Sequence, residues 1–117
     1  MASFSITMAR GDIEKRQFRI TSNDEPFDTE LDDIYFTVKQ AYNKTEYLFQ
    51  KRMSDNQIIK VGEGTYQFVI DPEDTNDLKF GSYSCDIEIV SLQNEIKKTF
   101  TGTLKLTEEA THAENEG

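Results

Sequence analysis

The sequence predicts an all-β fold built from two packed antiparallel sheets. In Tyr66–Ile70 and again in Tyr83–Ile89, apolar side chains occupy every second position, which is the period of strands that bury one face. The acidic linker between them, Asp71–Phe80, is too long for a tight hairpin. We therefore expect the chain to cross from one sheet to the other in this linker, as it does in a Greek key.

Alternating side chains also predict the strands of the N-terminal half. A first strand runs over Phe4–Met8 and a second over Ile13–Thr21. Asn23–Pro26 combines short polar side chains with a proline, which is the chemistry of a turn. A third strand follows at Ile34–Lys39, again with apolar residues at every second position.

The C-terminal half continues the pattern. Glu46–Lys51 is a weaker strand and Gln57–Val61 a short one, and Gly62–Gly64 turns tightly into the strand Tyr66–Ile70. The final strand, Ile96–Thr107, is long. About eight short strands with frequent turns are typical of a small β-sandwich.

Two local features refine this outline. Gly102 interrupts the inner face of the last strand, which suggests a bulge or the close approach of another backbone. Within the linker, Asp77–Phe80 has room for one helical turn and no more. No longer segment shows a helical period.

Length and charge restrict the class of protein. Residues 1–107 form one β-sandwich domain, and the acidic tail 108–117 is expected to be disordered. The 117 residues include 13 basic and 22 acidic ones, a formal net charge of −9. Because nucleic acids and anionic membranes both require basic surfaces, we expect neither as a partner.

The sequence offers little with which to build an active site. Its single cysteine, Cys85, lies at an inward position of a strand, and its single histidine, His112, lies in the tail. A catalytic thiol needs a nearby base, so Cys85 is interpreted as structural. The carboxylates of the linker are interpreted as solvated turn residues, because the spacing of a calcium loop is absent. We expect no enzymatic activity, no cofactor and no metal.

Tyr83-Ser84-Cys85 follows the linker directly and resembles the tyrosine corner of immunoglobulin domains, where a tyrosine bonds to upstream backbone. The chain has no tryptophan and no second cysteine, so an antibody-type domain is not supported. The predicted fold is therefore an immunoglobulin-like antiparallel β-sandwich with a Greek-key crossover. Tyr83, and Gly81 at the end of the linker, are assigned structural roles.

Arg10-Gly11-Asp12 matches the tripeptide that integrins recognise. A structural role for Gly11 is the better interpretation, because glycine permits a positive φ in the turn between two strands. For a binding interface we select three tyrosines that are expected to face outward, Tyr35, Tyr42 and Tyr47. Exposed aromatic rings next to polar groups suit interface anchors, although tyrosine is also common in strands.

Three landmarks together carry a family resemblance. They are Ile6–Asp12, Tyr35–Lys39, and Gly64–Tyr83 with Asp86–Glu88 after it, and the ending Gly102–Thr107 also fits. In order and spacing they resemble the small β-sandwich structural proteins of phages and prophages of Gram-positive bacteria. They are similar in particular to the N-terminal domain of the baseplate upper protein of lactococcal phages.

The resemblance implies a non-enzymatic virion component, associated with the tail or baseplate, that contacts other phage structural proteins. It also implies a location in the virion after synthesis in the bacterial host cytoplasm, and it allows a homo-oligomer. Two alternatives stay open: a carbohydrate-binding β-sandwich module, and a module that binds a host protein.

Overall fold

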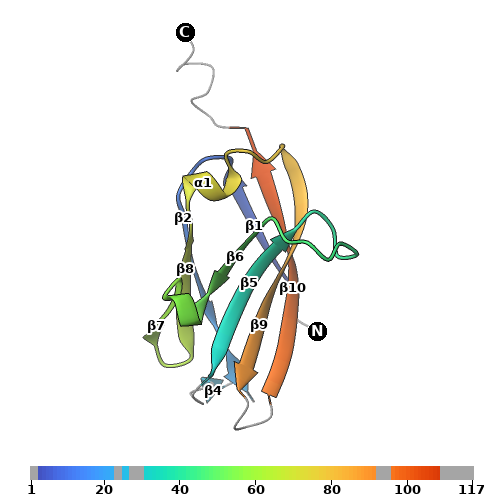
Figure 1. Cartoon of the computed structure of the whole chain (residues 1–117). Coiled ribbons are helices and arrows are strands. Elements are labelled where there is room, and N and C mark those ends of the chain that lie inside the picture. The colour runs from blue at the N-terminus through green and yellow to red at the C-terminus, as the bar shows by residue number, and fades with distance from the viewer. Residues whose placement is uncertain (1–2, 23–24, 27–30, 92–95, 109–117) are drawn as a thin grey trace.

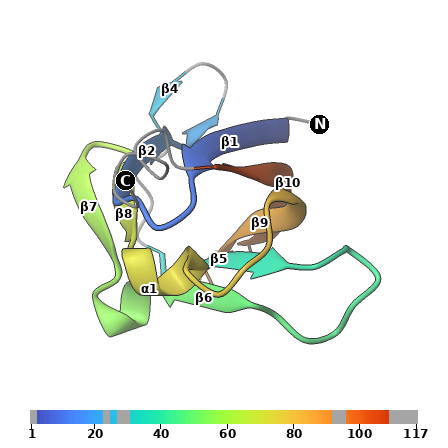
Figure 2. The ribbon, with the colours of Figure 1, turned by 90° about the horizontal axis from the view of Figure 1, so that it is seen from above.

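Two β-sheets face one another in the computed structural model, which describes residues 3–22, 25–26, 31–91 and 96–108. One sheet has five strands and the other has three (Figures 1 and 2). The expectation of a β-sandwich-like all-β fold is confirmed. The predicted disordered tail lies, apart from Glu108, outside the described residues, as do Asn23 and Asp24 of the expected turn.

The five-stranded sheet has the spatial order β1-β10-β9-β5-β6. Its strands, in that order, are Ser3–Ala9, Ile96–Thr107, Gly81–Ser91, Asp33–Lys39 and Phe49–Arg52. β1 and β6 are therefore its edges.

The three-stranded sheet has the order β2-β8-β7, with β2 and β7 as its edges. These strands are Glu14–Arg19, Thr65–Ile70 and Ile58–Gly62. Four small elements complete the described chain: the paired β3 (Thr21–Ser22) and β4 (Glu25–Pro26), the 3₁₀ turn η1 (Met53–Asp55) and the helical turn α1 (Pro72–Thr75).

The prediction of a wholly antiparallel sandwich is wrong at one edge. β1 pairs with β10 in parallel, with Phe4 opposite Gly102, whereas the other paired strands in the described chain run antiparallel. Alternation shows which face of a strand is buried, but it contains no information about the neighbouring strand or its direction.

The helical turn also lies elsewhere than expected. It covers Pro72–Thr75 at the start of the linker and not Asp77–Phe80. Asp71 and Asp74 form a capping box, and proline stands at the first helical position, which is the signature of a helix N-terminus. In Figure 1, α1 lies at one end of the sandwich, where the chain passes from β8 to β9.

The core joins the two sheets through aromatic rings. Phe36 of β5 stacks on Phe68 of β8, with 4.3 Å between the ring centroids. Around this pair lie inward residues of both sheets that are almost completely buried: Ile34, Val38, Ile58, Ile70, Cys85, Ile89, Leu104 and Leu106. The predicted alternation therefore identifies the core faces of the central strands.

Gly102 permits the close approach that its position suggested. A Cβ atom on residue 102 would lie 2.6 Å from the carbonyl oxygen of Phe4 and 2.7 Å from Cδ2 and Cε2 of its ring. Such distances are shorter than van der Waals contact, so only glycine lets β1 lie here. At the other end of β1, Gly11 adopts φ 84° in the turn toward β2, a conformation that favours glycine.

We predict that Gly102→Ala destabilises the protein by about 1 to 3 kcal/mol, because the added methyl group must displace Phe4 and with it β1. Gly62→Ala is the matched control, since a Cβ there would be no closer than 3.6 Å to Thr65. Urea unfolding of both variants measures the difference. Equal unfolding midpoints for the two variants would contradict this account of Gly102.

Candidate functional site

An open groove lies between β1 and β2, which are free edges of the two different sheets. Its volume is about 310 Å³. Phe4, Ser5 and Ile6 of β1 line one side and residues 16–19 of β2 line the other, with Phe68, Ile87 and Phe100 between them. The groove exists because β1 and β2, although consecutive in the chain, pair with β10 and β8 and not with each other.

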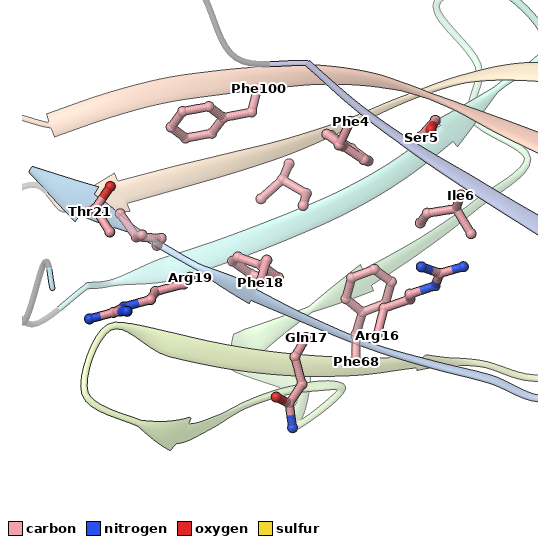
Figure 3. A pocket seen from close by; sticks show the side chains of 12 residues that line it. Phe4, Ser5, Ile6, Arg16, Gln17, Phe18, Arg19, Thr21, Phe68 and Phe100 are labelled. Carbon is pink, nitrogen blue, oxygen red and sulfur yellow. The ribbon is translucent and has the colours of Figure 1, made fainter. Parts of the chain in front are cut away.

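Aromatic side chains give the groove its apolar character. Phe4, Phe18 and Phe100 are each half-buried and pack against the core. Figure 3 shows Phe4 and Phe100 on the side of the five-stranded sheet, facing Phe18 and Phe68. The Phe18 ring stacks on Tyr66 at 5.8 Å and lies 6.1 Å from Phe68, centroid to centroid. The exposed part of each ring is available to a ligand.

Basic side chains form part of the rim. Arg16 and Arg19 both line the groove, in a chain whose net charge is −9. Nε of Arg16 lies 2.7 Å from a carboxylate oxygen of Glu14, and Arg19 is exposed. The groove therefore offers apolar surface with positive charge beside it.

The three tyrosines selected from the sequence lie elsewhere. None of them is among the described residues that line the groove. Tyr42 and Tyr47 are exposed in the loop between β5 and β6, and the Tyr42 hydroxyl donates a 2.6 Å hydrogen bond to the Gly102 carbonyl. Tyr35 is half-buried, with the Arg52 guanidinium 4.9 Å from its ring centroid.

Asp33 joins the Tyr35 region to the turn after β6. It accepts hydrogen bonds from the backbone N–H groups of Ser54 and Ile34 and pairs with Arg52 at 3.1 Å. Burial alone would raise the pKa of the Asp33 carboxyl, but these hydrogen bonds together lower it below 3.8. The contacts of Tyr35 are thus part of a cluster that fixes β5 against β6.

The interpretation of the linker carboxylates as merely solvated is wrong for Asp71 and Asp74. Lys51 points inward from β6 with only 5% of its surface exposed, and its Nζ lies 2.6 Å from Asp74 and 3.2 Å from Asp71. Burial lowers the pKa of Lys51, but the two carboxylates raise it further, so the net shift is upward. The ammonium group stays charged and anchors the start of the linker.

Three further contacts hold the rest of the linker. The Gly11 N–H donates to the buried Thr75 hydroxyl at 2.8 Å, and Arg10 donates to the Leu78 carbonyl and lies over the Phe80 ring. The integrin-like tripeptide thus has a structural use. The Tyr83 hydroxyl donates to the Lys79 carbonyl at 2.6 Å, which is the upstream backbone bond that the sequence predicts.

Gly81 is the first residue of β9 and Cys85 is the fifth. The backbone of Gly81 and the burial of Cys85 agree with the structural roles assigned to them. Gly81 has φ 136°, a conformation that side-chain-bearing residues rarely adopt. Cys85 is 1% exposed, and burial, with a smaller contribution from Asp86, raises the pKa of its thiol to about 12. A thiol in this state is a poor nucleophile.

No group of three or more His, Cys, Asp or Glu side chains is arranged to hold a metal ion in the part of the chain that the structure describes. Likewise, none of the helices within the described ranges has the length and apolar character needed to cross a membrane.

The sequence pattern does not reveal the groove, although it places Phe18 and Phe100 on inner faces and Gln17 and Arg19 on an outer face. Phe4, Phe18 and Phe100 alternate with outward residues as core residues do, and only the strand order shows that they lie at open edges. One feature of the sequence does indicate an open edge. Arg16 stands two residues before Phe18 and so shares its inward face of the strand, and a charged residue on an inner face is typical of an edge strand.

Comparisons with known proteins give the fold and little more. No family model matches the chain, and no curated protein matches it. A solved structure, the endo-β-1,4-mannanase from Thermotoga petrophila, is similar with a TM-score of 0.52 at 14% identity. The match covers 90% of this chain but 18% of the mannanase chain, so this chain corresponds to a small part of that protein. At this identity the likeness is one of fold alone.

We predict that Lys51→Ala destabilises the protein by about 2 to 4 kcal/mol, because it leaves two partly buried carboxylates without their cation. Lys105→Ala is the control, since Lys105 is exposed on β10. Thermal unfolding near neutral pH compares the two variants. A melting temperature for Lys51→Ala equal to that of Lys105→Ala would show that the ion pair contributes nothing.

We predict that Cys85 reacts far more slowly with a thiol reagent in the native protein than in denaturant. Between about pH 7 and about pH 9 an ordinary thiol ionises progressively, whereas a thiol with a pKa of about 12 stays protonated. Reaction with an aromatic disulfide followed by absorbance gives both rates. Rapid native labelling that titrates near the ordinary thiol pKa would contradict the buried assignment.

Proposed function

We propose that this chain is a non-catalytic binding module that acts by protein–protein contact through the groove between β1 and β2. The observation that carries the proposal is the group of three half-buried phenylalanines, Phe4, Phe18 and Phe100, beside Arg16 and Arg19. Aromatic residues and arginine are enriched in the cores of protein interfaces and among residues that dominate binding energy.

The fold proposed for the module is immunoglobulin-like with a Greek-key crossover. Two observations support it: the chain passes from β8 in one sheet through α1 to β9 in the other, and Tyr83 bonds to backbone four residues upstream. The parallel pairing of β1 with β10 is the departure from a wholly antiparallel arrangement.

The setting that we propose is a phage virion, where the module would contact other structural proteins of the tail or baseplate and could form homo-oligomers. Support for this setting comes from the sequence resemblance over Ile6–Asp12, Tyr35–Lys39 and Gly64–Tyr83. A partner from the host is the alternative within the same mode of action, and the groove chemistry applies to both.

A carbohydrate-binding module is the second candidate. The fold likeness to a small part of an endo-β-1,4-mannanase favours it, because an aromatic groove can also stack against sugar rings. The rings in the lining all belong to phenylalanine and present no polar group of their own to sugar hydroxyls. Hydrogen bonds to a sugar would have to come from polar side chains of the groove such as Arg16, Gln17 and Arg19.

We predict that panning random displayed peptides on the purified protein enriches clones that bind in the groove. The enriched clones should no longer bind the Phe100→Ser variant, which lacks a ring of the groove. They should still bind the control variant Tyr47→Ser, which lacks an exposed aromatic ring outside the groove. Arg19→Glu, a fully surface change, provides a second groove variant if Phe100→Ser unfolds.

The same proteins are tested in parallel on β-1,4-mannooligosaccharides by calorimetry. Clones whose binding is unaffected by both groove variants, or no enrichment at all, would overturn the protein-binding proposal. Oligosaccharide binding that Phe100→Ser abolishes would instead establish the second candidate.

A further inference from the structure

We propose that the free edge of β1 accepts an extended segment of a partner protein as an added strand, and that this segment alternates apolar with acidic side chains. The inference rests on the proposed function, because it specifies the partner that the groove between β1 and β2 would bind. Four features of the described chain carry it: the composition of the edge strands, the direction of the β1 backbone groups, the apolar groove and the rim charge.

β1 differs from the other three edges of the five-stranded and three-stranded sheets. β7 carries Lys60 and a register shift before Gly62, and β6 has only four residues, two of them basic. β2 contains one acidic and three basic residues. Charges, bulges and short length are the devices that prevent strands from pairing at an edge. β1, with the sequence Ser-Phe-Ser-Ile-Thr-Met-Ala, has seven residues and neither a charge nor a proline.

The backbone of β1 leaves hydrogen-bonding groups on its open side. Arg10, directly after β1, donates its N–H to the Thr107 carbonyl of β10 at 3.0 Å. Since backbone groups point to alternate sides along a strand, Ser5 and Thr7 direct their N–H and C=O groups away from β10. An added strand can pair with these groups, as in recognition by β-strand addition.

A segment paired with β1 would place every second side chain in the groove. The inner-facing residues of β1 are Phe4, Ile6 and Met8, and side chains of a neighbouring strand at the same level share their face. Those side chains would enter the space between Phe4, Phe18 and Phe100 that no strand now fills (Figure 3). The partner positions that point inward are therefore apolar.

Charge selects an acidic partner over a second copy of this chain. Arg16, which is paired with Glu14, and the exposed Arg19 line the groove on the β2 side, so a strand between β1 and β2 meets positive charge that comes mainly from Arg19. Pairing β1 with its own copy would bring two basic β2 strands toward each other. Salt screens the acidic residues that lie far from the groove, because the screening length is roughly 8 Å at physiological salt. The arginines beside the groove therefore decide whether a bound segment is attracted or repelled.

The test uses the purified full chain and a fluorescent acetylated peptide, Glu-Ile-Glu-Phe-Glu-Val-Glu, with Lys-Ile-Lys-Phe-Lys-Val-Lys as the matched control. We expect the acidic peptide to bind and the basic peptide to bind at least about tenfold more weakly. Thr7→Pro removes an outward N–H without removing a bond to β10, a change that edge strands tolerate. It should weaken binding about tenfold or more, whereas Thr7→Ala keeps the N–H and should bind as the original protein does.

Binding is measured by fluorescence polarisation, and heteronuclear NMR locates the peptide from amide shifts of β1. Arg19→Glu should reverse the preference between the two peptides, and circular dichroism establishes that each variant is folded. Equal binding of the acidic peptide by Thr7→Pro and Thr7→Ala would overturn strand addition. Equal binding of the acidic and basic peptides would overturn the assignment of an acidic partner.

Self-association that Thr7→Pro abolishes would replace the acidic partner with a second copy. Absence of binding by the acidic peptide would also reject this inference. The broader proposal is judged separately by the displayed peptides, since groove-dependent clones without alternating acidic residues would keep the function and reject only this mode.

Discussion

The contact between Phe4 and Gly102 is the constraint on which the candidate binding surface depends. Because residue 102 has no side chain, the Phe4 carbonyl and ring can occupy the space where a Cβ would stand. β1 therefore pairs with β10 in register with Phe4 opposite Gly102 and becomes an edge of the five-stranded sheet. That position leaves β1 facing β2 across a gap that neither strand closes, and it turns the Phe4 ring into a wall of the groove. The Tyr42 hydroxyl donates a hydrogen bond to the carbonyl of the same glycine, so the loop between β5 and β6 is held at this point as well.

The other end of the sandwich is held by contacts of a different kind. The linker between β8 and β9 is bound by Lys51 from β6, by the Gly11 turn between β1 and β2, and by Tyr83 from β9. A buried ion pair is weak evidence for stability, since desolvation offsets its attraction. Its geometric effect is clear nevertheless: Lys51 fixes where the capping box of α1 lies, and α1 in turn places Thr75 against Gly11. The turn that follows β1 is therefore held at this end of the sandwich, while the groove lies beside the beginning of β1.

The sequence predicts which face of a strand is buried better than it predicts which strands lie next to each other. Alternation identifies the inward residues of β5, β8 and β9 because a period of two is a local property of the chain. It assigns Phe4 and Phe18 to the interior by the same rule, yet these rings are only half-buried, since burial at an edge depends on which strand lies next to it. The parallel pairing of β1 with β10 and the partner of Lys51 are likewise long-range properties. The outward tyrosines were selected for their chemistry alone, and two of the three make contacts within the fold.

An uncharged edge strand in a protein of net charge −9 is consistent with selective recognition. Exposed edges with free backbone groups favour association between copies, which proteins ordinarily prevent by placing charges on the edge itself. Here the charges lie on the neighbouring strand β2, where Arg16 and Arg19 oppose the approach of an identical β2 strand. β1 itself carries no charge, so in the proposed mode of binding its outward backbone groups stay accessible to a partner strand. In the proposed mode of binding, a partner segment would fit when its charge matches the rim and its apolar residues match the phenylalanines, so the rim and the groove together would supply the specificity of the edge.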